Sequence, residues 1–405
     1  MHVVIIGAGQ AGAALAAKLR GLGHTGPITM IGDEAAPPYQ RPPLSKAYLM
    51  GEMAAERLWL RAPEFWADQG VDLRLGTPVT GVDTVAQTVT VGADVIAYDA
   101  LALTTGSSPR RLPAAMGGDL AGVYTVRTLT DVDAMRAEFA PGRRVVIVGG
   151  GYIGLEAAAV AAKLGLHVTV LEMAPRILQR VAAPETSAHF RALHAAHGVQ
   201  VLEATGLERL LGDGDLTRAR VTGARLSDGR EIAADFVIVG VGITPNTALA
   251  QAAGITIDNG IATDAMGRTS AAGVWAAGDC ASFPWQGGRL RLESVGHAID
   301  QAELVAANML GAAQPYDAKP WFWSDQYDCK LQIAGLNTGY DRIVTRPGDG
   351  GAVSFWYYRG PHLLALDAMN DARAYMVGKR LIESAKSPDP GLVADPATDL
   401  KALLR

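Results

Sequence analysis

The chain has 405 residues, 49% of them hydrophobic and 19% charged, so it is long enough for two or three domains with separate cores. Its formal net charge of -5 excludes a general electrostatic attraction to nucleic acid or to an anionic membrane. Its two cysteines, Cys280 and Cys329, exclude a disulfide framework and a zinc quartet, and we predict no metal site. No apolar stretch approaches the about 20 residues of a membrane span and no targeting signal precedes Val3, so we expect a cytoplasmic protein.

A strand–helix–strand unit is predicted at the N-terminus. An apolar run at 3–6 leads into Gly7-Ala8-Gly9-Gln10-Ala11-Gly12, a helix to about residue 22 and a strand at 28–31. The first glycine of such a fingerprint permits the tight turn, the second permits close approach of a pyrophosphate, and the third lets the helix pack on the strand. We therefore predict a dinucleotide site at Gly7, Gly9 and Gly12.

The same order of elements returns in the middle of the chain. A strand at 145–148 is followed by a second glycine-rich turn, a helix to residue 164 and a strand at 167–171. The phosphate charge of a bound dinucleotide would again rest at the positive end of a helix. A second dinucleotide site is predicted at Gly149, Gly151, Tyr152, Ile153 and Gly154.

An acidic residue after the second strand of each unit is expected to accept hydrogen bonds from a ribose. In the first unit this residue is Asp33 or Glu34, and in the second unit it is Glu172. Because a carboxylate repels a 2′-phosphate, Glu172 favours NADH over NADPH, although Arg176 and Arg180 lie close to it in sequence.

The two halves read as one architecture used twice. Hairpin-like stretches at 79–98 and 219–233 follow the two units, and each leads to a buried strand that ends in glycine, at 100–106 and 236–242. The aromatic content rises from residue 321. We therefore predict an α/β fold with two dinucleotide-binding Rossmann-like domains, one inserted in the other, plus a C-terminal α+β domain. The predicted domains are 1–108 with 236–316, then 109–235, then 317–405, and from residue 387 we expect a poorly ordered surface extension.

Four segments have a more specific pattern. They are Pro38-Tyr39-Gln40-Arg41-Pro42-Pro43-Leu44-Ser45-Lys46, Gly151-Tyr152-Ile153-Gly154-Leu155-Glu156, Gly278-Asp279-Cys280-Ala281 and Trp321-Phe322-Trp323-Ser324-Asp325-Gln326-Tyr327. With these segments the chain resembles the FAD-dependent ferredoxin reductases of bacterial oxygenase systems, which have a glutathione-reductase-like fold. The resemblance implies FAD in the domain of residues 1–108 and 236–316, and NADH in the inserted domain. It also implies a short strand that delivers Gly278 and Asp279 to a turn before a helix.

The resemblance implies roles for single residues. FAD would be bound by the first fingerprint together with Asp33, Glu34, Arg41, Lys46, Thr105, Gly106, Asp279, Glu293 and Val295, and NADH by the second fingerprint with Glu172 and Gly242. Val295 stands where many relatives have tryptophan.

Three catalytic residues are implied as well. Lys46 would lie beside the isoalloxazine ring and stabilise its negative charge, Glu156 would pair with Lys46, and Trp323 would lie near the flavin or the nicotinamide. The alternatives are an exposed helix lysine for Lys46, a glutamate favoured by the helix dipole for Glu156, and core packing for Trp323.

The positions of the cysteines bear on the reaction type. Glutathione-type relatives pass electrons from the flavin to a cysteine pair in the first flavin helix, but the first cysteine of this chain is Cys280. We therefore predict that electrons leave singly to an external [2Fe-2S] ferredoxin that serves a haem monooxygenase or a ring-hydroxylating dioxygenase. The ferredoxin would dock transiently, on a monomer or weak homodimer, through cations such as Arg289, Arg291, Arg342 and Lys330. A rubredoxin reductase and an NADH-sensing redox protein of the apoptosis-inducing-factor type are the alternatives.

Overall fold

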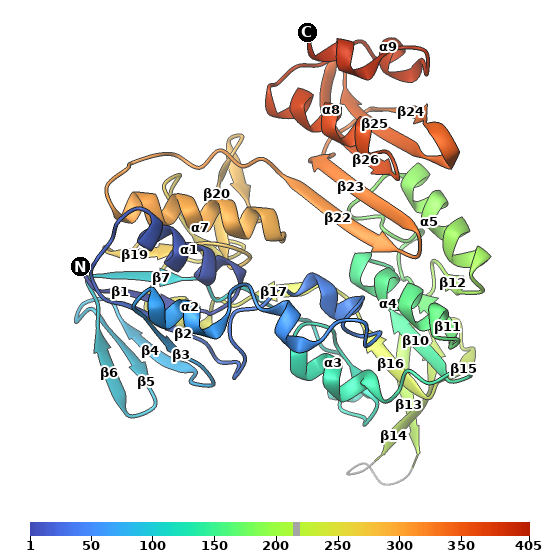
Figure 1. Cartoon of the computed structure of the whole chain (residues 1–405). Helices are drawn as coiled ribbons and strands as arrows, with labels where there is room; N and C mark the ends of the chain where they lie inside the picture. The colour runs from blue at the N-terminus through green and yellow to red at the C-terminus, as the bar shows by residue number, and fades with distance from the viewer. Residues whose placement is uncertain (214–218) are drawn as a thin grey trace. The chain divides into compact units, whose positions relative to one another are not determined.

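A computed structural model describes residues 1–213 and 219–405, and these residues form two compact units (Figure 1). The first unit contains Met1–Arg41, Ala54–Ser108 and Ile243–Pro320, and the second contains Pro42–Met53, Pro109–Gly242 and Trp321–Arg405. The three predicted domains are thus grouped into two units. Within the described residues, no helix has the length and apolar character needed to cross a membrane.

The first unit is built on a parallel sheet of five strands. Its order is β19 (Val274–Ala276), β7 (Ala100–Leu103), β1 (Val3–Ile6), β2 (Ile28–Ile31) and β3 (Val71–Arg74). All residues of β1, β2 and β7 are buried, which explains why these strands read as continuous apolar runs rather than alternating ones. Helix α1 (Gln10–Gly21) packs against α7 (Val295–Met309) beside this sheet (Figure 1).

Antiparallel strands complete the first unit. The predicted hairpin stretch forms β4 (Val79–Asp83), β5 (Thr88–Val91) and β6 (Asp94–Ala97). The predicted turn at Gly278 and Asp279 is present, but two strands, β20 (Ala281–Trp285) and β21 (Gly288–Leu290), lie between it and the predicted helix. The next helix is α7, capped by the hydroxyl of Ser294.

The second unit contains another parallel sheet of five strands. Its order is β12 (Gln200–Leu202), β11 (His167–Leu171), β10 (Arg144–Val148), β16 (Phe236–Val239) and β9 (Val123–Tyr124). The helices of this region are α3 (Leu129–Arg136), α4 (Tyr152–Lys163) and α5 (Pro184–Ala196). The predicted return to the first domain at residue 236 is too early, because β16 pairs with β10 and the first unit resumes at Ile243.

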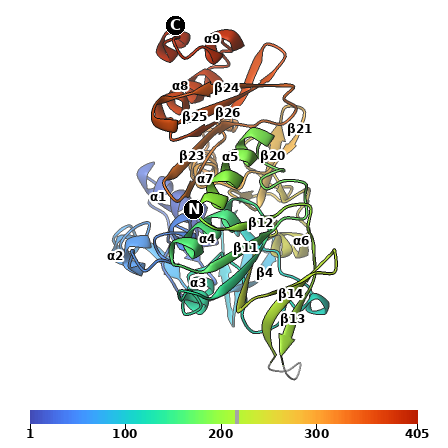
Figure 2. The same cartoon turned by 90° about the vertical axis from the view of Figure 1, so that its right-hand side faces the viewer.

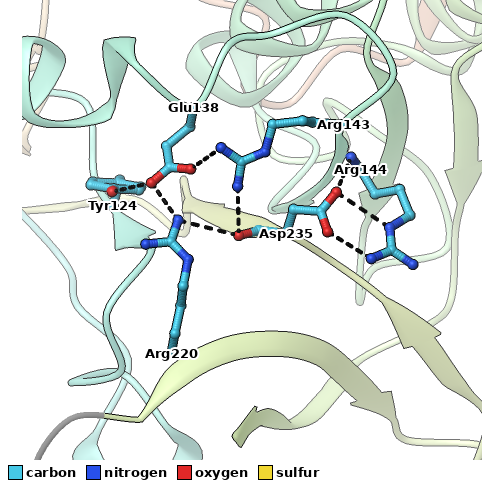
Figure 3. Close-up of polar contacts among 6 residues, drawn as sticks. All are labelled: Tyr124, Glu138, Arg143, Arg144, Arg220 and Asp235. Carbon is cyan, nitrogen blue, oxygen red and sulfur yellow. Dashed lines mark hydrogen bonds and ion pairs between the residues drawn. The ribbon is translucent and has the colours of Figure 1, made fainter.

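A buried carboxylate connects several elements at one end of this sheet. Figure 3 shows Glu138 between Arg143 and Arg220, with the ion pair to Arg143 at 2.5 Å and a hydrogen bond from Tyr124 at 2.8 Å. Burial opposes ionisation of Glu138, but the hydrogen bonds from Arg220 and Tyr124 and the charge of Arg143 outweigh it and lower the pKa of the carboxyl. Arg220 begins β14 (Arg220–Leu226), so the charges fix this strand to the parallel sheet.

The C-terminal part of the second unit is an antiparallel sheet. Its order is β22 (Trp321–Gln326), β23 (Cys329–Gly335), β26 (His362–Met369), β25 (Val353–Arg359) and β24 (Arg342–Pro347). Helix α8 (Ala372–Glu383) packs against β23 and β26 (Figure 2). Trp356, Tyr358, Leu366 and Leu381 form the core between them.

The segment after residue 387 is held in place, contrary to the prediction of a poorly ordered extension. It contains α9 (Pro390–Ala394), and its Val393 and Leu400 are 0% and 3% exposed within the core under α8. The guanidinium of Arg346 on β24 donates to the carbonyl oxygens of four residues of this C-terminal segment, at 2.7 to 3.2 Å. The four acceptors are Val393, Asp395, Pro396 and Thr398.

We expect Arg346→Lys to loosen the C-terminal segment. A lysine ammonium cannot present the forked set of donors that reaches four carbonyls, so the free energy of unfolding should fall by about 1–3 kcal/mol. Limited proteolysis should then cut the chain after residue 386 faster than in the wild type. Arg373→Lys is the matched control, because Arg373 forms an exposed ion pair with Asp399 of the same segment and its loss should change neither readout. Equal cleavage rates for Arg346→Lys and the wild type would contradict the role of Arg346.

A second buried carboxylate links the C-terminal sheet to α5. Asp367 on β26 is 1% exposed and accepts hydrogen bonds from Thr186 at 2.7 Å and from Tyr357. Tyr357 also accepts from the backbone N–H of Ala183 at 3.1 Å. Burial raises the pKa of Asp367 to about 6, against the hydrogen bonds from Tyr357 and Thr186, which lower it.

Asp367 should make stability depend on pH. Its pKa is higher in the folded than in the unfolded chain, so its contribution to stability is present below about pH 4 and is lost as the pH rises through about 6. Between pH 4.5 and 7.5 the wild type should therefore lose on the order of 2 kcal/mol relative to Asp367→Asn. Thermal unfolding of both proteins at the two pH values measures this difference. Asp119→Asn, which alters an exposed carboxyl, should follow the wild type at both values.

Candidate functional site

The first glycine turn has no room for larger residues at two of its three glycines. Gly7 has a φ of +112°, and a Cβ atom there would lie 2.2 Å from the carbonyl oxygen of Thr104. At Gly12 a Cβ atom would lie 2.0 Å from the carbonyl oxygen of Gly7, which explains how α1 approaches β1 so closely. Gly9 differs, because within the described residues no heavy atom comes within 4 Å of the position of its Cβ.

The second glycine turn repeats this geometry in the second unit. Gly149 also has a φ of +112°, and its Cβ would lie 2.3 Å from the carbonyl oxygen of Gly240. A Cβ at Gly154 would lie 2.1 Å from the oxygen of Gly149, while at Gly151 the described residues again leave the space within 4 Å open. The two turns are therefore built in the same way, with two closely packed glycines and one open one.

Both open glycines fit a pyrophosphate. Gly9 and Gly151 are the N-cap residues of α1 and α4, and in the described structure neither helix start receives a hydrogen bond from a capping side chain. The backbone N–H groups of the first helical turn are thus directed at the space that a Cβ atom would fill. This supports the predicted dinucleotide sites in each unit.

The carboxyl ends of the first parallel sheet carry several of the other residues predicted for FAD. Gly7 follows β1, Asp33 and Glu34 follow β2, Thr105 and Gly106 follow β7, and Asp279 follows β19. In a parallel sheet these ends lie at one edge, which is where ligands of such folds bind.

Glu34 and Arg41 form an ion pair at this edge. Arg41 contacts Glu34 at 2.6 Å, and the hydroxyl of Tyr39 donates to the same carboxylate at 2.6 Å. Asp33 is exposed. The two acids that the sequence left as alternatives therefore differ: Glu34 orients Arg41, and Asp33 is open to a ribose.

Thr105, Asp279 and Glu293 are each fixed by a neighbour in the first unit. Thr105 donates to the backbone oxygen of Asn246 at 2.6 Å. Asp279 accepts from Ser107 at 2.8 Å, and Glu293 contacts Arg291 at 2.8 Å. Val295 is the first residue of α7, one position after its cap. These contacts position the groups predicted to face the flavin.

The second unit contains a cavity of about 480 Å³ at the second glycine turn. It is lined by Gly149–Tyr152, Glu172, Met173, Arg180 and Gly240–Gly242, among others. This places Gly149, Gly151, Tyr152, Glu172 and Gly242 of the predicted NADH site around one space. Ile153 is 42% exposed, and Gly154 packs α4 on β10.

Glu172 is held at the wall of this cavity by the backbone. Its carboxylate accepts from the N–H of Gly150 at 2.9 Å and from the N–H of Ala174 at 2.7 Å. Arg176 donates to the hydroxyl of Ser187 at 2.6 Å, whereas Arg180 lines the cavity. A negative charge is therefore fixed where a ribose is expected, and Arg180 is the one cation among the cavity residues named above.

Lys46 and Glu156 form a nearly buried ion pair in the second unit. The distance from Nζ to Oε2 is 2.8 Å, and the two side chains are 18% and 6% exposed. Glu156 also accepts from Ser45 at 2.7 Å and from Ser324 at 2.8 Å. A buried carboxylate is tolerated when such donors surround it. The predicted pairing of Lys46 with Glu156 is present in the structure.

Comparison with known proteins assigns the chain to a family. Residues 1–302 match the family described as "Pyridine nucleotide-disulphide oxidoreductase", and residues 321–404 match the one described as "Reductase C-terminal". The chain belongs to the pyridine nucleotide-disulphide oxidoreductase family. This oxidoreductase is 44% identical, over 99% of its length and 97% of the relative, to the 5,5'-dehydrodivanillate O-demethylase ferredoxin reductase subunit of Sphingobium sp. strain SYK-6. It is 40% identical to putidaredoxin reductase of Pseudomonas putida, over 100% of its length and 96% of the relative.

A solved structure matches over the same extent. The crystal structure of the covalent putidaredoxin reductase–putidaredoxin complex has a TM-score of 0.95 and 40% identity, and the match covers 100% of this oxidoreductase and 98% of that chain. The predicted resemblance to ferredoxin reductases of oxygenase systems and the predicted fold class are confirmed.

Trp323 lies on the opposite face of β22 from Ser324, because side chains alternate along a strand. Its ring stacks on that of Trp321, with centroids 5.5 Å apart and planes at 20°. Trp323 is partly exposed, so its predicted contact with the flavin or nicotinamide stays a prediction.

The cations predicted to dock a partner fall into two groups. Arg289 and Arg291 bond to neighbours in the first unit, since Arg289 donates to Thr263 at 2.9 Å and Arg291 to the backbone of Asp279 at 3.1 Å. Arg342 and Lys330 are exposed on the C-terminal sheet and stay candidates.

Sequence reasoning missed three donors of the site. Gly150 supplies an N–H to Glu172, and Ser45 and Ser324 supply hydroxyls to Glu156. The middle glycine of Gly149-Gly150-Gly151 gave no separate signal. Ser324 and Gln326 could have been noticed, because they lie on the same face of the predicted strand as Phe322. Polar residues on such a face indicate buried hydrogen bonding.

We expect Lys46 and Glu156 to be energetically coupled in this oxidoreductase. Lys46→Met leaves a buried carboxylate without its cation and should lower the free energy of unfolding by about 2–4 kcal/mol. Lys46→Met with Glu156→Gln should cost less than the sum of the single variants, with a coupling of about 1–3 kcal/mol. Denaturant unfolding of the four proteins measures the coupling. Lys163→Met with Glu52→Gln, an exposed pair at 3.3 Å, is the control and should show little coupling, whereas additivity at Lys46 and Glu156 would contradict a direct pair.

Proposed function

We propose that the chain is an NADH-dependent flavoprotein reductase that passes electrons one at a time from FAD to a [2Fe-2S] ferredoxin. The observation that carries this proposal is the repeated glycine turn. One chain has two helix N-termini with the same open central glycine, one in each unit, and so has places for two dinucleotides.

The cysteines support an external electron acceptor. Burial raises the pKa of the Cys280 thiol, and burial with Asp328 and Asp325 raises the pKa of Cys329 to about 12. Burial thus disfavours the reactive thiolate form of both side chains, and they are the only cysteines of the sequence. Reduced FAD would then deliver its electrons to a separate protein.

The residues of this chain would bind and orient the two cofactors. When bound, FAD accepts a hydride and releases electrons singly, which connects a two-electron donor to a one-electron acceptor. The first glycine turn, Arg41 and Asp279 would hold it, and the glycine turn at Gly151 with Glu172 would hold NADH. Lys46 would supply a fixed positive charge that Glu156 keeps in place.

The relatives support the choice of acceptor. Two proteins that match almost the whole chain are named as a ferredoxin reductase subunit and as putidaredoxin reductase, and a matching structure contains putidaredoxin. We propose that the acceptor ferredoxin serves a haem monooxygenase or a ring-hydroxylating dioxygenase. We also propose that the protein acts in the cytoplasm, where NADH is supplied.

Rapid-mixing spectroscopy tests the function and the cofactor preference together. The purified chain should bind FAD, and NADH should bleach its visible absorbance much faster than NADPH does. A [2Fe-2S] ferredoxin should then reoxidise it in two one-electron steps. Glu172→Gln should narrow the preference for NADH by about tenfold or more, because it removes the charge that repels a 2′-phosphate. A flavin that NADH leaves oxidised, or that stays reduced with every ferredoxin offered, would contradict the proposal.

A further inference from the structure

Strand β22 directs three side chains at two helices of the same unit. Phe322 contacts the ring of Tyr152 on α4, with centroids 4.9 Å apart. Ser324 contacts Glu156 on α4, and Gln326 contacts His194 on α5. Ser324, Gln326 and His194 are each 0% exposed, so this polar set is buried completely.

These contacts form one continuous chain of hydrogen bonds that ends on Glu156. Ser324 donates to Oε1 of Glu156 at 2.8 Å, and Gln326 donates to the hydroxyl of Ser324 at 3.1 Å. Nε2 of His194 lies 2.8 Å from Oε1 of Gln326, and the hydroxyl of Tyr327 lies 3.2 Å from Nδ1 of His194. The other carboxylate oxygen of Glu156 accepts from Lys46 and Ser45.

The chemistry of the groups fixes the direction of the chain. A carboxylate can only accept, so Ser324 must donate to Glu156, and the amide N–H of Gln326 must donate to Ser324. The amide oxygen of Gln326 can only accept, so His194 must carry a proton on Nε2. Nδ1 of the neutral ring is then free to accept from Tyr327.

The surroundings of His194, at the end of the hydrogen-bond chain far from Glu156, favour its neutral form. Burial and the charge of His197 lower the pKa of His194, against the hydrogen bond to Gln326, which raises it. The groups that face it are Gln326 and Tyr327 from the C-terminal segment and His197 from the end of α5. The hydroxyl of Tyr327 can donate to the unprotonated Nδ1 of the neutral ring.

Tyr327 has an unusual backbone for a bulky residue. Its φ is +56°, in a two-residue turn between paired Gln326 and Cys329, where asparagine or glycine is usual. Its ring stacks on His197 with centroids 3.6 Å apart. The cost of this conformation is offset by contacts that only the aromatic side chain makes.

We propose that Ser324, Gln326 and His194 are positioning residues that hold the carboxylate of Glu156 aligned with Lys46. Every link of the chain directs a donor toward the Glu156 carboxylate, so the links add to one another. Loss of an inner link would let the carboxylate rotate, and Lys46 would then lose its partner. The proposal rests on the proposed function only for its kinetic test.

Nitrogen NMR tests the direction of the chain without any cofactor chemistry. In protein labelled with 15N-histidine, the His194 signals, assigned with His194→Gln, should be those of the neutral Nε2–H tautomer between pH 6 and 8. Gln326→Met, which keeps the volume but removes the acceptor, should produce a mixture of tautomers. An Nδ1–H tautomer or an imidazolium in the wild type would overturn the proposal.

Flavin reduction by NADH in the FAD-loaded protein tests the effect on the pair. Ser324→Ala should slow reduction about tenfold, since a hydrogen bond to a charged group is lost. Ser324→Thr, which keeps the hydroxyl, should restore the rate. Ser354→Ala is the matched control, because Ser354 is a fully buried serine of the same sheet whose hydroxyl accepts from Trp356 at 3.0 Å. It should lower the melting temperature without changing the rate.

Two results separate this inference from the proposed function. A wild-type rate of flavin reduction in both Ser324→Ala and Gln326→Met would overturn the inference and leave the proposed function intact. A wild-type flavin that NADH does not reduce would overturn the proposed function, and the NMR result would still decide whether the chain of donors exists.

Discussion

The second unit depends on the burial of the Lys46–Glu156 pair. A carboxylate that is 6% exposed must receive hydrogen bonds, and two segments far from it in sequence supply them: residues 45–46 and β22. This requirement explains why residues 42–53 belong to the second unit although they follow the first one in sequence. The same pair therefore links the fold of this unit to the charge that the proposed reaction needs.

The same glycine-turn geometry occurs in both units. Each combines two glycines that no other residue can replace with one that leaves space for a ligand. The difference between the units lies after the second strand. There Glu172 is fixed by two backbone amides, whereas Glu34 is used to orient Arg41 and leaves Asp33 exposed. The repeated turn provides binding, and the residues beyond it provide discrimination.

The sequence predicted those features that depend on local pattern. The strands at 3–6 and 28–31 were predictable because a fully buried parallel strand consists mostly of apolar residues, and the turns because glycine is required by backbone contact. The domain boundary at 236 and the order of the segment after 387 were not. Both depend on partners distant in sequence: β10 pairs with β16, and Arg346 binds the carbonyls of the last residues. The prolines and polar residues near Ser387 are typical of a surface segment. This composition does not show whether an arginine elsewhere in the chain binds the segment.

The hydrogen-bond chain that ends on Glu156 is another feature that could not be predicted from local sequence pattern. Lys46 and Glu156 were predicted from a resemblance, but Ser324 and Gln326 stood in the same motif as Trp323 and only the tryptophan was singled out. Strand alternation divides that motif into two faces with different tasks: Trp321 and Trp323 stack on one face, and Ser324 and Gln326 reach the helices on the other. In a buried strand the small polar residues cost more free energy to desolvate than the aromatic ones, so their retention requires partners. The tryptophans are the most conspicuous residues of this motif in the sequence. The polar residues between them determine the geometry of the charged pair, because Ser324 contacts Glu156 directly.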